Sequence, residues 1–208
     1  ITGKSTEVYN IGTISIDNLL AEPIYSLSDF KDTFGIDLSK PSILITLHPE
    51  TVKADMNEQF ANEFASALIE LTEYQLVITM PNADTNGRVI REIFQKLKSE
   101  RSNVVLVENF GTKGYFSCIN HCSFLMGNTS SGLVEAASFN KYVINLGERQ
   151  LGRIQSENTF NCPFDKSEIL KKVTYIESLD PFTGENEYKM STSNSSDMII
   201  NVLKEIKL

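Results

Sequence analysis

Residues 123–139 read SFLMGNTSSGLVEAASF, an apolar run that passes through small and hydroxyl-bearing residues into a helical pattern. Similar β-rich runs occur elsewhere, and the expected strands cover 42–48, 75–80, 103–109, 123–128 and 141–147. Amphipathic stretches lie between and after them, at about 57–73, 86–101, 114–121, 130–139, 166–178 and 195–207. Continuous apolar strands that alternate with helices predict an α/β fold, a Rossmann-like parallel sheet with helices on both faces. The polar segment 179–194 is expected to be a loop.

The composition indicates one substantial globular domain, because 208 residues with 41% hydrophobic content are enough to bury a full core. The net charge of −8 argues against binding of long nucleic acid through a basic face. Cys118, Cys122 and Cys162 form no CxxC pair, so we expect small buried thiols in a reducing cytosol, without disulfide or metal. No membrane span or signal peptide is recognised, which predicts a cytoplasmic protein. The chain opens at Ile1 as if in mid-protein, and we interpret it as an excised domain.

The strongest candidate site is the GNTSSG segment at 127–132, because ligands of parallel sheets bind beyond the carboxyl ends of the strands. The free N–H groups of the following helical turn can bind a phosphate together with the hydroxyls of Thr129, Ser130 or Ser131. Glu135 comes about one turn later, where its carboxylate can accept hydrogen bonds from both hydroxyls of a ribose. The alternative is a helix capped by serine, with Glu135 as an ordinary surface carboxylate.

Two basic residues stand at the ends of other expected strands. His48 closes the run SILITLH, where it can donate to a phosphate or add positive charge near a leaving group. The alternative is a partly buried histidine held by a backbone carbonyl, and His121, inside a helical stretch, is expected to be structural. Arg149 follows the turn at Gly147, and its planar guanidinium suits a diphosphate, although a solvated surface arginine is the alternative.

Asn82 and Phe110 complete the candidate residues. Asn82 follows a strand and can contact phosphate or sugar, but turn-forming asparagines are common. The segment 109–111 offers backbone groups and the Phe110 ring to a flat base, unless that ring belongs to the core. GxGxxG, Walker A and HExxH motifs do not occur, so the sequence does not support NAD, ATP or zinc sites of the usual kind.

Four ordered motifs resemble the C-terminal domain of hydrolysing UDP-N-acetylglucosamine 2-epimerases, a family that starts the synthesis of sialic and related nonulosonic acids. They are LHPET at 47–51, PNAD at 81–84, the GNTSSG segment with its following glutamate, and INLGERQLGR at 144–153. The resemblance runs from about residue 8 to beyond 160. It implies a GT-B-like enzyme of two Rossmann-like halves, in which residues 1–208 form the UDP-binding C-terminal domain and the N-terminal domain is absent.

The resemblance also implies the chemistry. Such enzymes eliminate UDP from UDP-GlcNAc and then add water, which yields ManNAc and UDP without a cofactor. The acid and base carboxylates belong to the N-terminal half, so the chain alone is expected to be inactive, and the full-length protein to be a homo-oligomer. The assigned roles are leaving-group catalysis for His48, phosphate or sugar for Asn82, uracil for Phe110, diphosphate for Thr129 and Ser130, ribose for Glu135, and the UDP pocket for Arg149.

Two alternatives remain open at this point. The donor-nucleotide domain of a GT-B glycosyltransferase would use the same sheet and the same ribose glutamate, and fold alone does not separate the two. A stand-alone nucleotide-sensing module without chemistry is the other. The sequence also leaves open whether the sugar is GlcNAc or a diacetamido variant.

Overall fold

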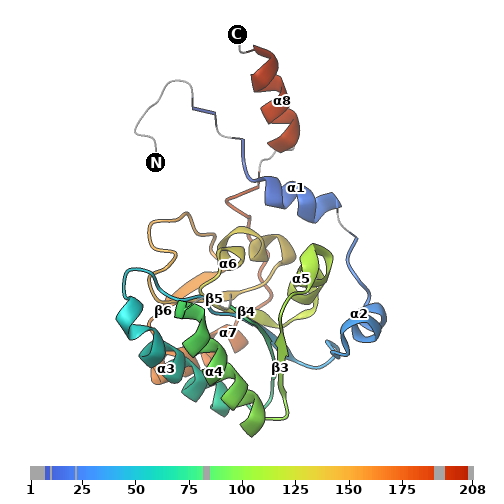
Figure 1. Ribbon diagram of the computed structural model, residues 1–208. Helices are drawn as coiled ribbons and strands as arrows, with labels where there is room; N and C mark the ends of the chain where they lie inside the picture. The colour runs from blue at the N-terminus through green and yellow to red at the C-terminus, as the bar shows by residue number, and fades with distance from the viewer. Residues whose placement is uncertain (1–7, 10, 22, 82–84, 190–194, 206–208) are drawn as a thin grey trace.

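The computed structural model describes residues 8–9, 11–21, 23–81, 85–189 and 195–205. Its centre is a parallel sheet with the strand order β3-β2-β1-β4-β5-β6 (Figure 1). The strands are β1 (Ser42–Thr46), β2 (Gln75–Thr79), β3 (Val104–Val107), β4 (Phe124–Gly127), β5 (Val143–Leu146) and β6 (Thr159–Cys162). The chain order reverses between β1 and β4, which places the expected ligand crevice at the ends of these two central strands.

Helices cover both faces of the sheet, so the predicted Rossmann-like α/β fold is confirmed. They are α1 (Ile14–Ala21), α2 (Leu27–Phe34), α3 (Asn57–Glu70), α4 (Thr85–Glu100), α5 (Gly111–His121), α6 (Ser130–Val134), α7 (Lys166–Glu177) and α8 (Ser195–Glu205), with short 3-10 turns η1 (Ala54–Met56) and η2 (Ala136–Phe139). In Figure 1, α1 and α8 lie together beyond α6, apart from α3 and α4.

The core has two parts because side chains alternate across each strand. Ile43 and Ile45 of β1 belong to one cluster of buried residues, which also contains Phe64 of α3 and Phe94 of α4. Leu44, between them, belongs to a second cluster that is built on α2 and α5. Both faces of β1 are therefore buried, which explains why its sequence is continuously apolar.

Some elements differ from the sequence-based expectation. The expected strands are all present, but β6, α1 and α2 were not predicted, because β6 is short and polar and the two helices have only eight residues each. The expected helix over 130–139 divides into α6 and η2 and ends at Asn140, whose φ of 56° is left-handed. Residues 179–189 contain no helix or strand, as predicted for that part of the loop, and 190–194 lie outside the described residues.

The cysteines have the environment expected of them. Cys118, Cys122 and Cys162 are all free and buried. Burial raises the pKa of the Cys122 thiol to about 12 and that of Cys162 to about 11, so both remain protonated at neutral pH. Of the helices that the structure describes, none has both the length and the apolar character needed to cross a membrane.

Candidate functional site

A pocket of about 450 Å³ lies at the carboxyl ends of the strands. Thr79 at the end of β2, residues 108–112 after β3, and Ser130, Ser131 and Glu135 after β4 all line it. Ser15 of α1 and Tyr115 of α5 contribute to the same pocket. The structure thus brings together Phe110, Ser130 and Glu135, which the sequence placed after two different strands.

Glu135 is not the surface carboxylate of the alternative interpretation. Its side chain is only 9% exposed, and its Oε2 atom has no hydrogen-bond partner among the described residues. Burial raises the pKa of this carboxyl group, while the neighbouring hydroxyls of Ser15 and Ser131 act in the opposite direction. A buried acceptor without a donor is costly unless a ligand supplies the donor, so Glu135 has the properties of a binding residue.

The start of α6 bears on the capping alternative for Thr129. Thr129 is the N-cap of the helix, and its Oγ1 atom accepts a hydrogen bond from the N–H of Ser131 at 3.4 Å. The hydroxyl is therefore used locally, as in the capping alternative, although threonine takes the place of serine. Gly127 precedes this turn with a φ of 136°, and a Cβ atom there would lie 2.0 Å from the carbonyl oxygen of Thr46. Only glycine lets β4 run this close to β1 and continue into the turn.

His48 lies beside this turn, held by its backbone rather than by its ring. Its N–H donates to Oδ1 of Asn128 at 2.7 Å, and Nδ2 of Asn128 donates to its carbonyl oxygen at 2.8 Å. The imidazole, half-buried, has no such contact among the described residues. Burial lowers the pKa of His48, and the nearby charge of Arg149 lowers it further, so the ring is neutral at neutral pH. A neutral ring can donate one N–H to a phosphate but carries no positive charge until an anion binds.

Arg149 belongs to a loop that a buried carboxylate holds in place. Oε1 of Glu50 accepts hydrogen bonds from the backbone N–H groups of Glu148 and Arg149, each at 3.0 Å. Glu50 is only 3% exposed and its own backbone is paired with the side-chain amide of Asn57. From this loop, Nη1 of Arg149 donates to the carbonyl oxygen of Asn128 at 3.2 Å. The guanidinium therefore lies beside His48, although Arg149 is an exposed residue.

Sequence reasoning missed Glu50, Asn57, Asn128 and Gln150. Gln150 is 1% exposed and donates to the same carbonyl of Asn128 at 2.7 Å. Glu50, Asn128 and Gln150 stand inside the motifs quoted above, but no sequence signal indicated that they contact one another. Their partners lie up to 99 residues away in the chain.

The remaining predictions have mixed outcomes. Phe110 is 6% exposed, and the centroid of its ring lies 5.0 Å from that of Phe34 and 5.5 Å from that of Phe30. It therefore belongs to the core as well as to the pocket wall. His121 is structural as expected, because its Nε2 atom is paired with the carbonyl oxygen of Tyr25 at 2.8 Å. Asn82 lies outside the described residues.

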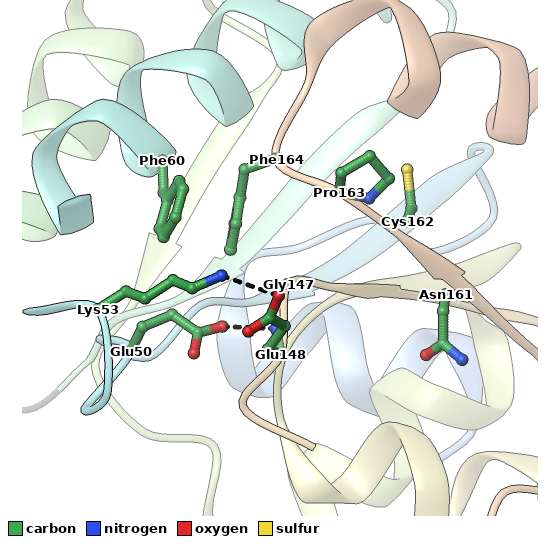
Figure 2. Close-up of a pocket in the computed structure, with 9 residues that line it drawn as sticks. All are labelled: Glu50, Lys53, Phe60, Gly147, Glu148, Asn161, Cys162, Pro163 and Phe164. Carbon is green, nitrogen blue, oxygen red and sulfur yellow. Dashed lines mark hydrogen bonds and ion pairs between the residues drawn. The ribbon is translucent and has the colours of Figure 1, made fainter. Parts of the chain in front are cut away.

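A separate pocket of about 340 Å³ is lined by Gly147 and Glu148 of the loop of Arg149 (Figure 2). Lys53 reaches across it to Glu148 at 2.8 Å, below the stacked rings of Phe60 and Phe164. None of the predicted site residues lines this pocket. In the described ranges, no group of three or more acidic, cysteine or histidine side chains is placed to hold a metal ion.

Comparisons with known proteins show the family of the chain. A family model described as UDP-N-acetylglucosamine 2-epimerase matches residues 2–204. The UDP-N,N'-diacetylbacillosamine 2-epimerase (hydrolyzing) of Legionella pneumophila is 29% identical over 168 residues, covering 80% of this chain and 44% of that protein. The GDP/UDP-N,N'-diacetylbacillosamine 2-epimerase (hydrolyzing) of Campylobacter jejuni is 30% identical, covering 74% of this chain and 41% of its own length.

Among solved structures, the S. aureus MnaA-UDP co-structure has a similar fold, with a TM-score of 0.72 at 20% identity. The alignment covers 97% of this chain and 54% of that one. The chain therefore spans about half the length of the proteins it matches.

Proposed function

Because the chain belongs to the UDP-N-acetylglucosamine 2-epimerase family, we propose that it is the UDP-binding C-terminal domain of a hydrolysing 2-epimerase. The complete enzyme converts UDP-GlcNAc into ManNAc and UDP by elimination of UDP and hydration of the resulting glycal. The other half of the active site, with the acid and base carboxylates, belongs to an N-terminal domain of the same protein. The reaction supplies an amino sugar for the synthesis of sialic or related acids.

The observation that carries the proposal is the pocket that joins Phe110, Ser130 and Glu135. We place the uracil against the backbone of residues 109–111, where Gly111 adopts a φ of 63°. The ribose then lies at Glu135, and the diphosphate at the first turn of α6. This order runs the nucleotide from the end of β3 past β2 and β1 to the end of β4, as ligands of such sheets bind.

His48 and Arg149 serve the leaving group in this scheme. Departure of UDP places negative charge on the terminal phosphate, and preorganised donors stabilise charge that develops in the transition state. Arg149 supplies a permanent positive charge, and the neutral imidazole of His48 supplies an N–H donor. Binding of the anionic diphosphate favours the protonated form of His48, which strengthens the same hydrogen bond.

The names of the relatives bear on the sugar. Two of them are named for diacetylbacillosamine nucleotides, while the matching family model is named for UDP-N-acetylglucosamine. Both sugars carry an acetamido group at C2, the carbon at which the family inverts the configuration. A UDP-linked 2-acetamido sugar is accordingly the substrate class that we propose. The fold would equally suit a GT-B glycosyltransferase, but the family match favours the epimerase.

The isolated chain is expected to bind UDP without a metal ion and to show no epimerase turnover. The donors proposed for the diphosphate are protein groups, and half of the catalytic cleft is missing. Isothermal titration calorimetry with UDP, with and without EDTA, tests the binding, and NMR of UDP-GlcNAc incubated with the chain tests the turnover. Binding that depends strictly on a divalent ion contradicts the proposal.

Glu135→Gln is expected to weaken UDP binding by roughly 1–3 kcal/mol, about five- to 150-fold, because the amide accepts more weakly than the carboxylate. The same variant should be more stable than the wild type when free of ligand. Folding raises the pKa of Glu135 above 4.5, so keeping this carboxyl group ionised at neutral pH lowers the stability of the folded wild type. This loss of stability disappears as the pH falls towards 4.5, because the carboxyl group is then protonated in both the folded and the unfolded chain.

Titration with UDP and thermal melting at pH 7 and pH 4.5 check both parts of this prediction. Glu148→Gln is the matched control, because Glu148 is exposed and does not line the pocket of Glu135. If 2′,3′-dideoxy-UDP loses as much affinity as UDP on mutation of Glu135, the ribose assignment is wrong.

A further inference from the structure

The pocket of Glu135 holds an unusual concentration of unpaired polar atoms. The described residues contain six buried side-chain oxygen atoms without a hydrogen-bond partner. Four of the six belong to residues that line this one pocket: Oγ of Ser15, Oη of Tyr115, Oγ of Ser131 and Oε2 of Glu135. Buried polar groups in native proteins are normally paired, so such a cluster indicates a ligand that supplies the missing partners.

The hydroxyl of Tyr115 is the one of these atoms that α5 contributes. The Tyr115 ring lies on α5 and packs against the core cluster that includes Phe30 and Leu44. A phenylalanine would fill the same space without burying an unpaired oxygen. Burial raises the pKa of Tyr115, the neighbouring hydroxyls of Ser131 and Thr46 lower it, and the negative charge of Glu135 raises it, so all three groups lie near the phenol oxygen. The phenol remains protonated and keeps a proton to donate.

The chemistry of the four atoms matches a vicinal diol. A carboxylate only accepts hydrogen bonds, whereas the hydroxyls of serine and tyrosine both donate and accept. The two hydroxyls of a ribose can each donate to Glu135, and their oxygens then need donors in return. Tyr115 from α5 and Ser15 from α1 are placed beside Glu135 to supply them, and each approaches the pocket from a different helix.

We propose that Tyr115 and Ser15 read the ribose diol together with Glu135 and select ribonucleotides over deoxyribonucleotides. This inference rests on the proposed function for the identity of the ligand. A site built around hydrogen bonds to a hydroxyl discriminates strongly against an analogue that lacks it, because the buried protein groups are then left unpaired. Because Ser15 belongs to α1, its contact with the ribose would also connect that helix to the nucleotide.

The test compares UDP, 2′-deoxy-UDP and 3′-deoxy-UDP on the wild-type chain, Tyr115→Phe and Ser15→Ala by calorimetry. The wild type should bind at least one deoxy analogue about tenfold or more weakly than UDP. Each variant should bind UDP about five- to tenfold more weakly, with a smaller loss for the analogue that lacks its hydroxyl partner. The preference for ribose therefore shrinks in both variants.

Tyr142→Phe is the matched control, because the hydroxyl of Tyr142 donates to the carbonyl oxygen of Asp180 at 2.9 Å and does not line this pocket. It should lower the melting temperature slightly and leave UDP affinity unchanged. Tyr115→Phe should weaken UDP binding without lowering the melting temperature. The inference is overturned if Tyr115→Phe and Ser15→Ala bind UDP as well as the wild type, or lose affinity equally for all three nucleotides. A wild-type chain that binds no UDP overturns the proposed function instead, and with it the ligand named here.

Discussion

In the proposed two-domain enzyme, His48→Ala is expected to lower kcat by about a hundredfold or more and to leave the protein folded. A hundredfold change corresponds to about 2.7 kcal/mol of transition-state stabilisation, which is typical for the loss of one preorganised donor to a developing anion. The fold should survive because Asn128 holds the backbone of His48, and alanine keeps both of these hydrogen bonds. Steady-state kinetics and thermal melting on the same preparation measure the two effects.

His121→Ala is the control for this experiment. The His121 ring is paired with the carbonyl oxygen of Tyr25, so its removal should lower the melting temperature and leave kcat nearly normal. A near-normal kcat together with a lowered melting temperature for His48→Ala would make His48 a structural residue. A larger loss of activity for His121→Ala at equal stability would require a different location for the ligand crevice.

Glu50→Ala is expected to lower the free energy of unfolding by about 3 kcal/mol, because two backbone N–H groups lose a charged acceptor and a buried cavity remains. For a chain of this size the melting temperature falls by roughly 6–12 °C. The loop that carries Arg149 loses its anchor at the same time, so UDP affinity should fall as well. Urea denaturation of the chain and calorimetry with UDP measure these changes.

The neighbouring glutamate provides the comparison. Glu148 is exposed, and its contact with Lys53 is a surface ion pair, which contributes at most about 1 kcal/mol. Glu148→Ala should therefore be nearly neutral for stability. Glu50→Gln, which keeps one acceptor oxygen, should fall between the two. If Glu50→Ala is no more destabilising than Glu148→Ala, Glu50 does not anchor the loop.

The sheet could be predicted because its strands are buried on both faces and read as continuous apolar runs. β6 was not predicted in this way, since Thr159 and Asn161 are polar. It is an edge strand and pairs with β5 alone. The single helix expected over 130–139 is α-helical only to Val134, because amphipathic spacing does not reveal the change to a 3-10 turn at Ala136. Helix periodicity and strand runs are local signals, and these errors occur where the signal is short.

The site was predictable at its strand ends and not in its supporting contacts. The sequence indicated Ser130, Glu135 and Phe110 from their positions after strands, and the structure places all three in one pocket. It did not indicate that Glu50 binds the loop of Arg149, because that contact joins residues 99 positions apart. Buried polar networks depend on partners from other elements, and a single sequence does not pair them. The roles proposed for these residues in nucleotide binding remain predictions.

The pairing of His48 with Asn128 has a consequence for the order in which the molecule assembles. Eighty positions separate the two residues, so their contact closes a long loop between β1 and β4. The units β1 to β3 and β4 to β6 each contain neighbouring strands that are close in sequence, and can pair earlier. The ligand pocket lies across the junction of these units, with residues 108–112 from one and Glu135 from the other. We therefore expect a nascent or partly folded chain to form most of its secondary structure before this pocket is complete.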